Sequence, residues 1–136
     1  MKHVARVAVA VIVAGMSLAV GCQYVGGSSR QVESGPYSGP NVGINSFAPQ
    51  HQIRVTAPTG GWDVGVDEAG ESGGRAQVFI TATKPAQDQM VMQALQVHEV
   101  NSTVDSRRPI DVYVRVVPRG SDPGDFPYRL AERSRE

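Results

Sequence analysis

The chain contains few residues that could carry out chemistry, and its single thiol is the most informative of them. Cys22 is the only cysteine among 136 residues. It follows a start that carries Lys2 and Arg6, an uncharged apolar run over residues 7–20, and Gly21. This order is typical of a bacterial lipoprotein signal peptide, whose removal leaves a lipid-modified cysteine at the new N-terminus. We therefore predict signal cleavage between Gly21 and Cys22 and a covalent lipid on Cys22.

The length of the apolar run favours a cleaved signal over a membrane-spanning helix. It covers 14 residues, whereas a helix needs about 20 to cross the hydrocarbon core. Two alternatives remain open, because Ala19 stands where lipoprotein signals usually carry leucine: a short uncleaved anchor, and a secretory signal that leaves a free thiol. Stable lipid anchoring requires at least two acyl chains. Since Gln23 is not the aspartate that retains many lipoproteins in the inner membrane, we expect the outer membrane of the cell envelope.

No other group of residues forms a recognisable reactive or metal-binding motif. His51 and His98 lie far apart in the sequence, without carboxylates at ligand spacing, and we expect both at the surface. Asp67, Glu68 and Glu71 do not continue as the alternating oxygen ligands of a calcium loop. No nucleophile–base motif is present. The sequence thus predicts no catalytic residues, no metal and no cofactor besides the lipid on Cys22.

Charge and composition exclude further classes of protein. Without residues 1–21 the chain loses Lys2 and Arg6, which leaves 11 lysine and arginine residues against 13 aspartate and glutamate residues. A near-neutral, slightly acidic chain without a basic cluster is not expected to bind nucleic acid, and no small-molecule substrate is evident. A single cysteine cannot form an intramolecular disulfide, so packing and hydrogen bonds must hold the fold.

The composition divides the chain into four parts. Residues 1–21 form the predicted lipoprotein signal peptide, and residues 22–50 are rich in Gly, Ser, Pro and Asn, which indicates a lipid-anchored flexible tether. Residues 51–118 alternate polar and apolar positions in short runs, as strands do. Residues 119–136 are predicted to be a polar C-terminal tail. A core this small contributes only about 3–5 kcal/mol, so we expect the domain to need a partner, self-association or part of the tether.

About five strands without a long helix predict an all-β fold, a small antiparallel β-sandwich or open barrel. The clearest strand covers residues 75–83. Residues 90–100 fit either a helix or a strand, and the β-branched residues that follow favour a strand. The candidate core or interface residues are Trp62, Val78, Ile80, Leu95 and Val114.

Part of this domain resembles a known family. Gly60-Gly61-Trp62, the hairpin over residues 64–83, Pro85 and the segment Val91-Met92-Gln93-Ala94-Leu95 are similar to the C-terminal domain of the protease-complex subunit PrcB. The resemblance covers about residues 58–97. It implies a small secreted or lipid-anchored protein that has no catalytic residues of its own and acts as a protease accessory subunit.

These observations predict a membrane-anchored lipoprotein that is not an enzyme. Its β domain is expected to dock on another envelope protein, because a small sheet with free edges is a natural docking surface. The alternative is a structural or cell-wall-associated lipoprotein that acts by anchoring alone.

Overall fold

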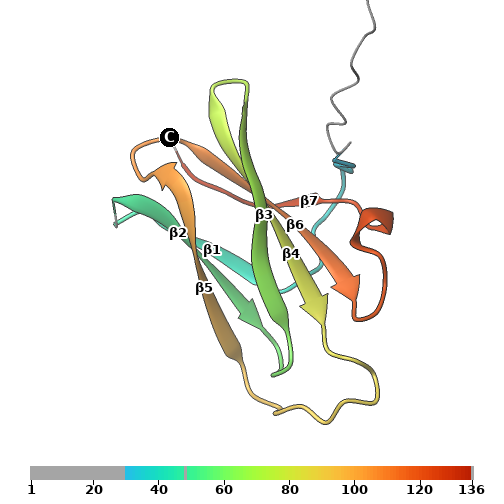
Figure 1. The fold of residues 1–136 in the computed structure, drawn as a ribbon. Coiled ribbons are helices and arrows are strands. Elements are labelled where there is room, and N and C mark those ends of the chain that lie inside the picture. Colours follow the sequence, from blue (N-terminus) through green and yellow to red (C-terminus); the bar gives the residue numbers. More distant parts are fainter. Residues whose placement is uncertain (1–29, 48, 136) are drawn as a thin grey trace, which may run out of the picture.

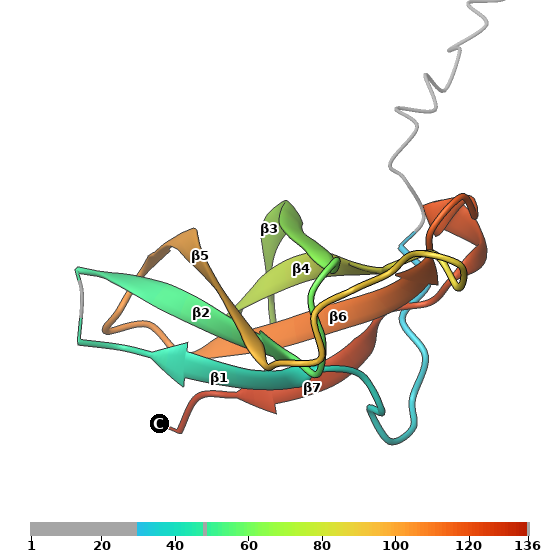
Figure 2. The ribbon, with the colours of Figure 1, turned by 90° about the horizontal axis from the view of Figure 1, so that it is seen from below.

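A computed structural model describes residues 30–47 and 49–135, which form two packed β-sheets (Figure 1). The predicted signal peptide and Cys22 lie outside the described residues. The smaller sheet has the order β1-β2-β5, and the larger one has the order β3-β4-β6-β7. The strands are β1 (Asn41–Asn45), β2 (Gln50–Ala57), β3 (Asp63–Ser72), β4 (Arg75–Lys84), β5 (Gln96–Asp105), β6 (Ile110–Pro118) and β7 (Arg129–Arg133). The all-β prediction is confirmed, and the two sheets form an open sandwich without a closed barrel (Figure 2).

One strand pair departs from the predicted antiparallel arrangement. β4 and β6 pair in parallel, from Ala76 opposite Ile110 to Lys84 opposite Pro118, whereas every other pair of strands in the described residues is antiparallel. A parallel pair requires a long crossover. Here the crossover is β5 itself, which the chain adds to the opposite sheet before it returns to the larger sheet as β6.

The sandwich also extends beyond both predicted domain boundaries. Within the segment predicted to be a flexible tether, β1 pairs with β2 and buries Val42. Within the predicted polar tail, a short 3-10 helix (Pro123–Asp125) leads into β7, which pairs with β6. Both predictions are wrong for these residues, because backbone pairing along a sheet edge stabilises short strands that carry few apolar side chains of their own.

The two sheets meet in a core of branched aliphatic side chains. Inward residues of β4 and β6 pack against those of β2, and Val78, Ile80 and Val114 are almost completely buried there. Trp62 is only partly buried and packs against the edge of this core. Leu95 lies outside the core. Among the described residues, no helix is long and apolar enough to cross a membrane.

Candidate docking surface

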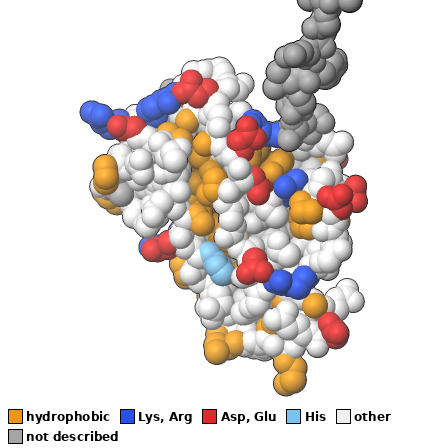
Figure 3. Space-filling model, in the orientation of Figure 1, with side chains coloured by type: hydrophobic (Ala, Val, Ile, Leu, Met, Phe, Trp, Pro, Cys, Tyr) orange, Lys and Arg blue, Asp and Glu red, His pale blue; other side chains and the backbone are white. Residues whose placement is uncertain are grey.

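The most prominent surface feature is a group of exposed apolar side chains in the connection from β4 to β5 and at the start of β5. Seven large hydrophobic residues of the described chain are exposed, and four of them fall within eight consecutive positions. We call these four residues the apolar tip: Met90 (99% exposed), Met92 (67%), Leu95 (71%) and Val97 (56%). In Figure 3, hydrophobic side chains project from the lower end of the molecule, where Figure 1 shows this connection. A cluster of this kind is typical of a site that binds another molecule.

The connection has a defined conformation, because backbone hydrogen bonds hold it, one of them from the double-glycine turn that precedes β3. The amide of Gly60 donates a hydrogen bond of 2.8 Å to the carbonyl oxygen of Met92, and the amide of Gln89 donates one of 3.0 Å to Ala86. Gly61 has a positive φ of 81°. A Cβ atom there would lie only 2.7 Å from Val91 Cγ1. Glycine is therefore needed at position 61 both for its backbone conformation and for close approach.

The structure corrects the predicted strand at residues 90–95. These residues adopt neither strand nor helix, and β5 begins only at Gln96. The connection crosses from one sheet to the other, so its backbone has no neighbouring strand and its side chains point away from the core. Leu95 is therefore available as an interface residue and not as a core residue.

Methionine gives the apolar tip a specific chemical character. Its unbranched, polarisable side chain adapts to surfaces of different shape, and methionine-rich patches are used where one protein binds apolar segments of another. A rigid backbone that presents adaptable side chains reduces the ordering cost of binding. The apolar tip is thus suited to protein recognition.

A second cluster lies on the outer face of the larger sheet, around Asp67. A β-bulge between Val66 and Glu68 makes Asp67 an extra residue in β3, which lets it point outward like its neighbour Glu68. Asp67 accepts hydrogen bonds from Thr81 and, at 2.7 Å, from the Tyr128 hydroxyl. Burial, and then the hydrogen bond to Asp67, raise the pKa of Tyr128. These contacts join β3, β4 and the residue that precedes β7.

A group of aromatic rings beside this cluster contacts Arg30, the first residue that the structure describes. Phe79 stacks on Tyr113 at 5.2 Å between ring centroids and meets Tyr128 edge-on at 5.1 Å. The Arg30 guanidinium lies 4.5 Å from the Phe79 ring centroid and forms an ion pair with Glu68. We assign this group a structural role, because its polar members satisfy one another and its rings cover the outer face of the sheet.

His51 is buried, contrary to its predicted surface position. Its Nδ1 lies 3.0 Å from Ser46 Oγ, and its Nε2 lies 2.6 Å from the carbonyl oxygen of Arg108. The ring thereby ties the start of β2 to the turn before β6, and the Ser102 hydroxyl donates to the backbone of His51 at 2.7 Å. The signal was present in the sequence, since His51 shares the inward periodicity of Ile53 and Val55.

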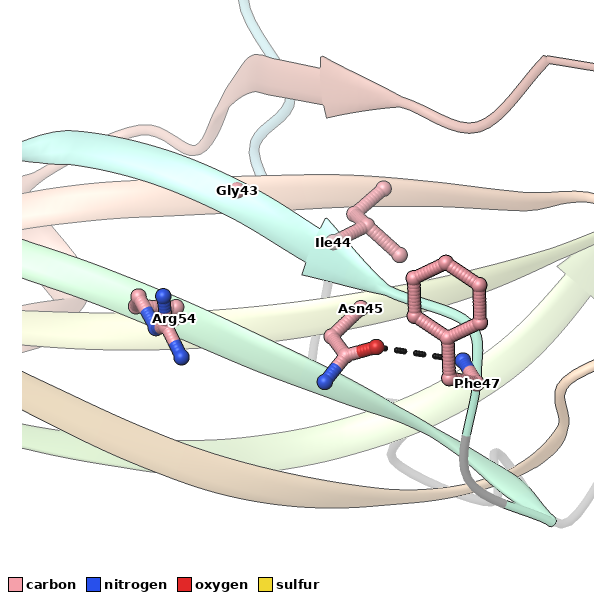
Figure 4. Close-up of a pocket in the computed structure, with 5 residues that line it drawn as sticks. All are labelled: Gly43, Ile44, Asn45, Phe47 and Arg54. Atoms are coloured by element: carbon pink, nitrogen blue, oxygen red, sulfur yellow. Dashed lines mark hydrogen bonds between the residues drawn. The ribbon is translucent and has the colours of Figure 1, made fainter.

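The pocket in Figure 4 lies on the outer side of β1 and β2. It has a volume of about 310 Å³ and is lined by Gly43, Ile44, Asn45, Phe47 and Arg54. The Asn45 side chain accepts a hydrogen bond of 3.1 Å from the Phe47 amide, and Arg54 is paired with Glu99 at 2.9 Å. The polar groups around this pocket thus serve local structure, and they do not converge on one point as in an active site.

The comparisons with known proteins give one family match, which covers the middle of the chain. Residues 54–97 match the family model PrcB C-terminal. This segment contains the second half of β2, the glycine turn, the β3–β4 hairpin and the whole apolar tip. No curated protein and no solved structure matches the chain significantly. The predicted resemblance to the PrcB C-terminal domain is confirmed for this segment, which is about a third of the chain.

Proposed function

We propose that this protein is a lipid-anchored accessory subunit that binds another protein of the cell envelope through the apolar tip. The observation that carries the proposal is the concentration of four exposed apolar side chains, three on a connection whose backbone is held in place and the fourth at the start of β5. The PrcB C-terminal match over residues 54–97 supports a protease complex as the partner. The protein itself contributes binding and not catalysis.

Anchoring forms the second half of this proposal. Cleavage after Gly21 and lipidation of Cys22 would place the domain at the membrane surface, with the outer membrane as the expected location. Only seven residues separate Cys22 from Arg30, so the anchor lies at most about 28 Å from the first described residue. A short tether raises the effective concentration of the domain near membrane-bound partners.

A co-purification experiment with matched variants tests the docking half. Full-length protein is extracted from envelopes as wild type, as the double variant Met90→Ser/Met92→Ser, and as Phe47→Ser. Phe47 is also 99% exposed but precedes β2, whereas the turn that contacts the β4–β5 connection follows the other end of β2, so Phe47 controls for the loss of any exposed apolar side chain. We expect a protease-complex subunit to co-purify with wild type and Phe47→Ser but not with the double variant. Equal recovery with all three would contradict the proposal.

Mass spectrometry of the mature N-terminus tests the anchoring half. We expect a chain that begins at Cys22 and carries acyl chains, and a Cys22→Ala variant that is not processed to this form. An intact residue 1–21 segment, or a mature chain with an unmodified thiol, would contradict it.

A further inference from the structure

The smaller sheet ends at β5 with an open edge. β5 has β2 as its only neighbour in the sheet, as far as the described residues go. Alternate amide and carbonyl groups along β5 therefore point away from β2 and find no ladder partner. The pairing between β2 and β5 is regular from Gln52 opposite Asn101 to Ala57 opposite Gln96, so this edge is straight over its first six residues.

The opposite sheet has an uncovered apolar surface beside this edge. Val66 pairs with the fully buried Ile80 and shares its core-facing side, yet Val66 remains 39% exposed. Ala69 pairs with the fully buried Val78 and is exposed as well. The three-stranded sheet therefore leaves part of the inner face of the four-stranded one uncovered, although β5 comes close to β3 along part of its length. Figure 3 shows a strip of hydrophobic side chains along this opening, between β5 and β3 of Figure 1.

The two strands that border the opening differ in how they are protected. β3 carries a bulge at Asp67 and two adjacent carboxylates, which are common protections against unwanted pairing. β5 contains no proline and no lysine, and its bulge lies at the far end, opposite residues 50–52. Of the two strands that border the opening, β5 is therefore the one whose edge can accept another strand.

A histidine of β5 gives a second, independent indication. His98 pairs with the buried Val55 and faces the interior. Its Nε2 atom is buried and has no hydrogen-bond partner in the described part of the chain. Buried polar atoms are nearly always paired, and a strand that joins this edge can bring a polar group within reach of this nitrogen.

We infer that the open edge of β5 accepts an extended segment of the partner protein as an eighth strand. Its inward side chains would be apolar and would cover Val66 and Ala69. Glu99 already pairs with Arg54 of β2 at 2.9 Å, and a basic residue on the outward side of the new strand would face Glu99 from its other side, because opposite charges stabilise directly facing cross-strand positions. The inference deepens the accessory role proposed above, on which it rests, but it uses a surface separate from Met90 and Met92.

Peptide selection on the full-length protein tests this inference. A library of displayed 12-residue peptides is selected on the detergent-solubilised chain, and a selected peptide is then used as the probe in hydrogen–deuterium exchange. We expect peptides that alternate apolar and polar residues and include a basic residue, and we expect slower exchange of the amides of residues 96–101 when the peptide is bound. Val66→Lys should weaken binding at least about tenfold, and selection on Glu99→Lys should enrich acidic peptides instead.

The controls separate the possible failures. Met90→Ser/Met92→Ser should leave the affinity for the selected peptide unchanged. If this variant loses its partner in the co-purification experiment but the peptide still protects the amides of β5, both proposals are supported. Thermal melting of Val66→Lys shows whether the variant is folded. The inference is overturned if no peptide is selected, if protection falls outside β5, or if Val66→Lys and Glu99→Lys bind as wild type does. Protection of β5 that rises with protein concentration alone would assign the edge to a second copy of this chain and also overturn it.

Discussion

The amide of Gly60 donates a 2.8 Å hydrogen bond to the carbonyl oxygen of Met92, and this contact joins the turn before β3 to the apolar tip. It couples two segments about 30 residues apart in the sequence. The exposed methionines are consequently presented from a supported backbone, although no strand or helix contains them.

Substitution of Gly61 should therefore loosen the apolar tip. In Gly61→Ala the new Cβ would clash with Val91 and Pro85, and the positive φ would be strained. We expect a loss of about 1–3 kcal/mol in the free energy of unfolding and faster hydrogen exchange over residues 86–95. Gly65→Ala is the matched control, because no atom lies within 4 Å of the place that its new Cβ would occupy. Similar exchange in both variants would show that the turn does not support the tip.

The apolar tip itself should contribute little to stability. Met90→Ser/Met92→Ser removes two side chains that lie in solvent, so we expect the free energy of unfolding to change by no more than about 0.5 kcal/mol per site. Chemical denaturation of the full-length chain measures this change. A large loss would mean that the methionines pack in the fold and are not reserved for a partner.

Asp111 should be the most sensitive charged residue. Its carboxylate is almost fully buried and is paired with Arg75 at 2.8 Å and with Arg133 at 2.9 Å. Removal of one member of a buried ion pair leaves uncompensated charge, and Asp111→Ala is expected to cost about 3–5 kcal/mol. The exposed pair of Arg54 and Glu99 provides the comparison, since Glu99→Gln should cost less than about 1 kcal/mol. Equal costs in a denaturation series would contradict this ranking.

The bond between Asp67 and Tyr128 should be visible in a tyrosine titration. Burial raises the pKa of Tyr128 first, and the hydrogen bond to Asp67 raises it further. Asp67→Asn removes the negative charge that strengthens this hydrogen bond, so the pKa of Tyr128 should fall. Absorbance at alkaline pH should then show one tyrosine that titrates at lower pH than in the wild type. An unchanged titration curve would place Tyr128 outside the influence of Asp67.

The sequence predicts some parts of this fold well and others poorly, for identifiable reasons. Strict period-two alternation in residues 75–83 is sufficient to locate β4 and its core residues Val78 and Ile80. β1 and β7 are not predicted, because each has only five residues and depends on pairing with a neighbour. The bulge at Asp67 is also not predicted, since it arises from the register between β3 and β4. Register is a tertiary property that one strand's sequence does not specify.

For the candidate docking surface too, the sequence predicts some features and not others. The resemblance to PrcB over about residues 58–97 locates the correct segment, and the double glycine before Trp62 predicts the turn. The exposure of Met90, Met92 and Leu95 could not be predicted, because their apolar character is equally compatible with a buried strand. Only the crossover between sheets, fixed by the pairing of β5 with β2, places these side chains in solvent.

Site-specific photocrosslinking tests the central claim most directly. A photoreactive amino acid replaces Met92 in the full-length chain in intact envelopes, and Phe47, which is equally apolar and fully exposed, provides the control position. We predict a discrete protein adduct from position 92 that contains a protease-complex subunit, and no such adduct from position 47. Crosslinks from position 92 to lipid alone, or the same adducts from both positions, would contradict the account.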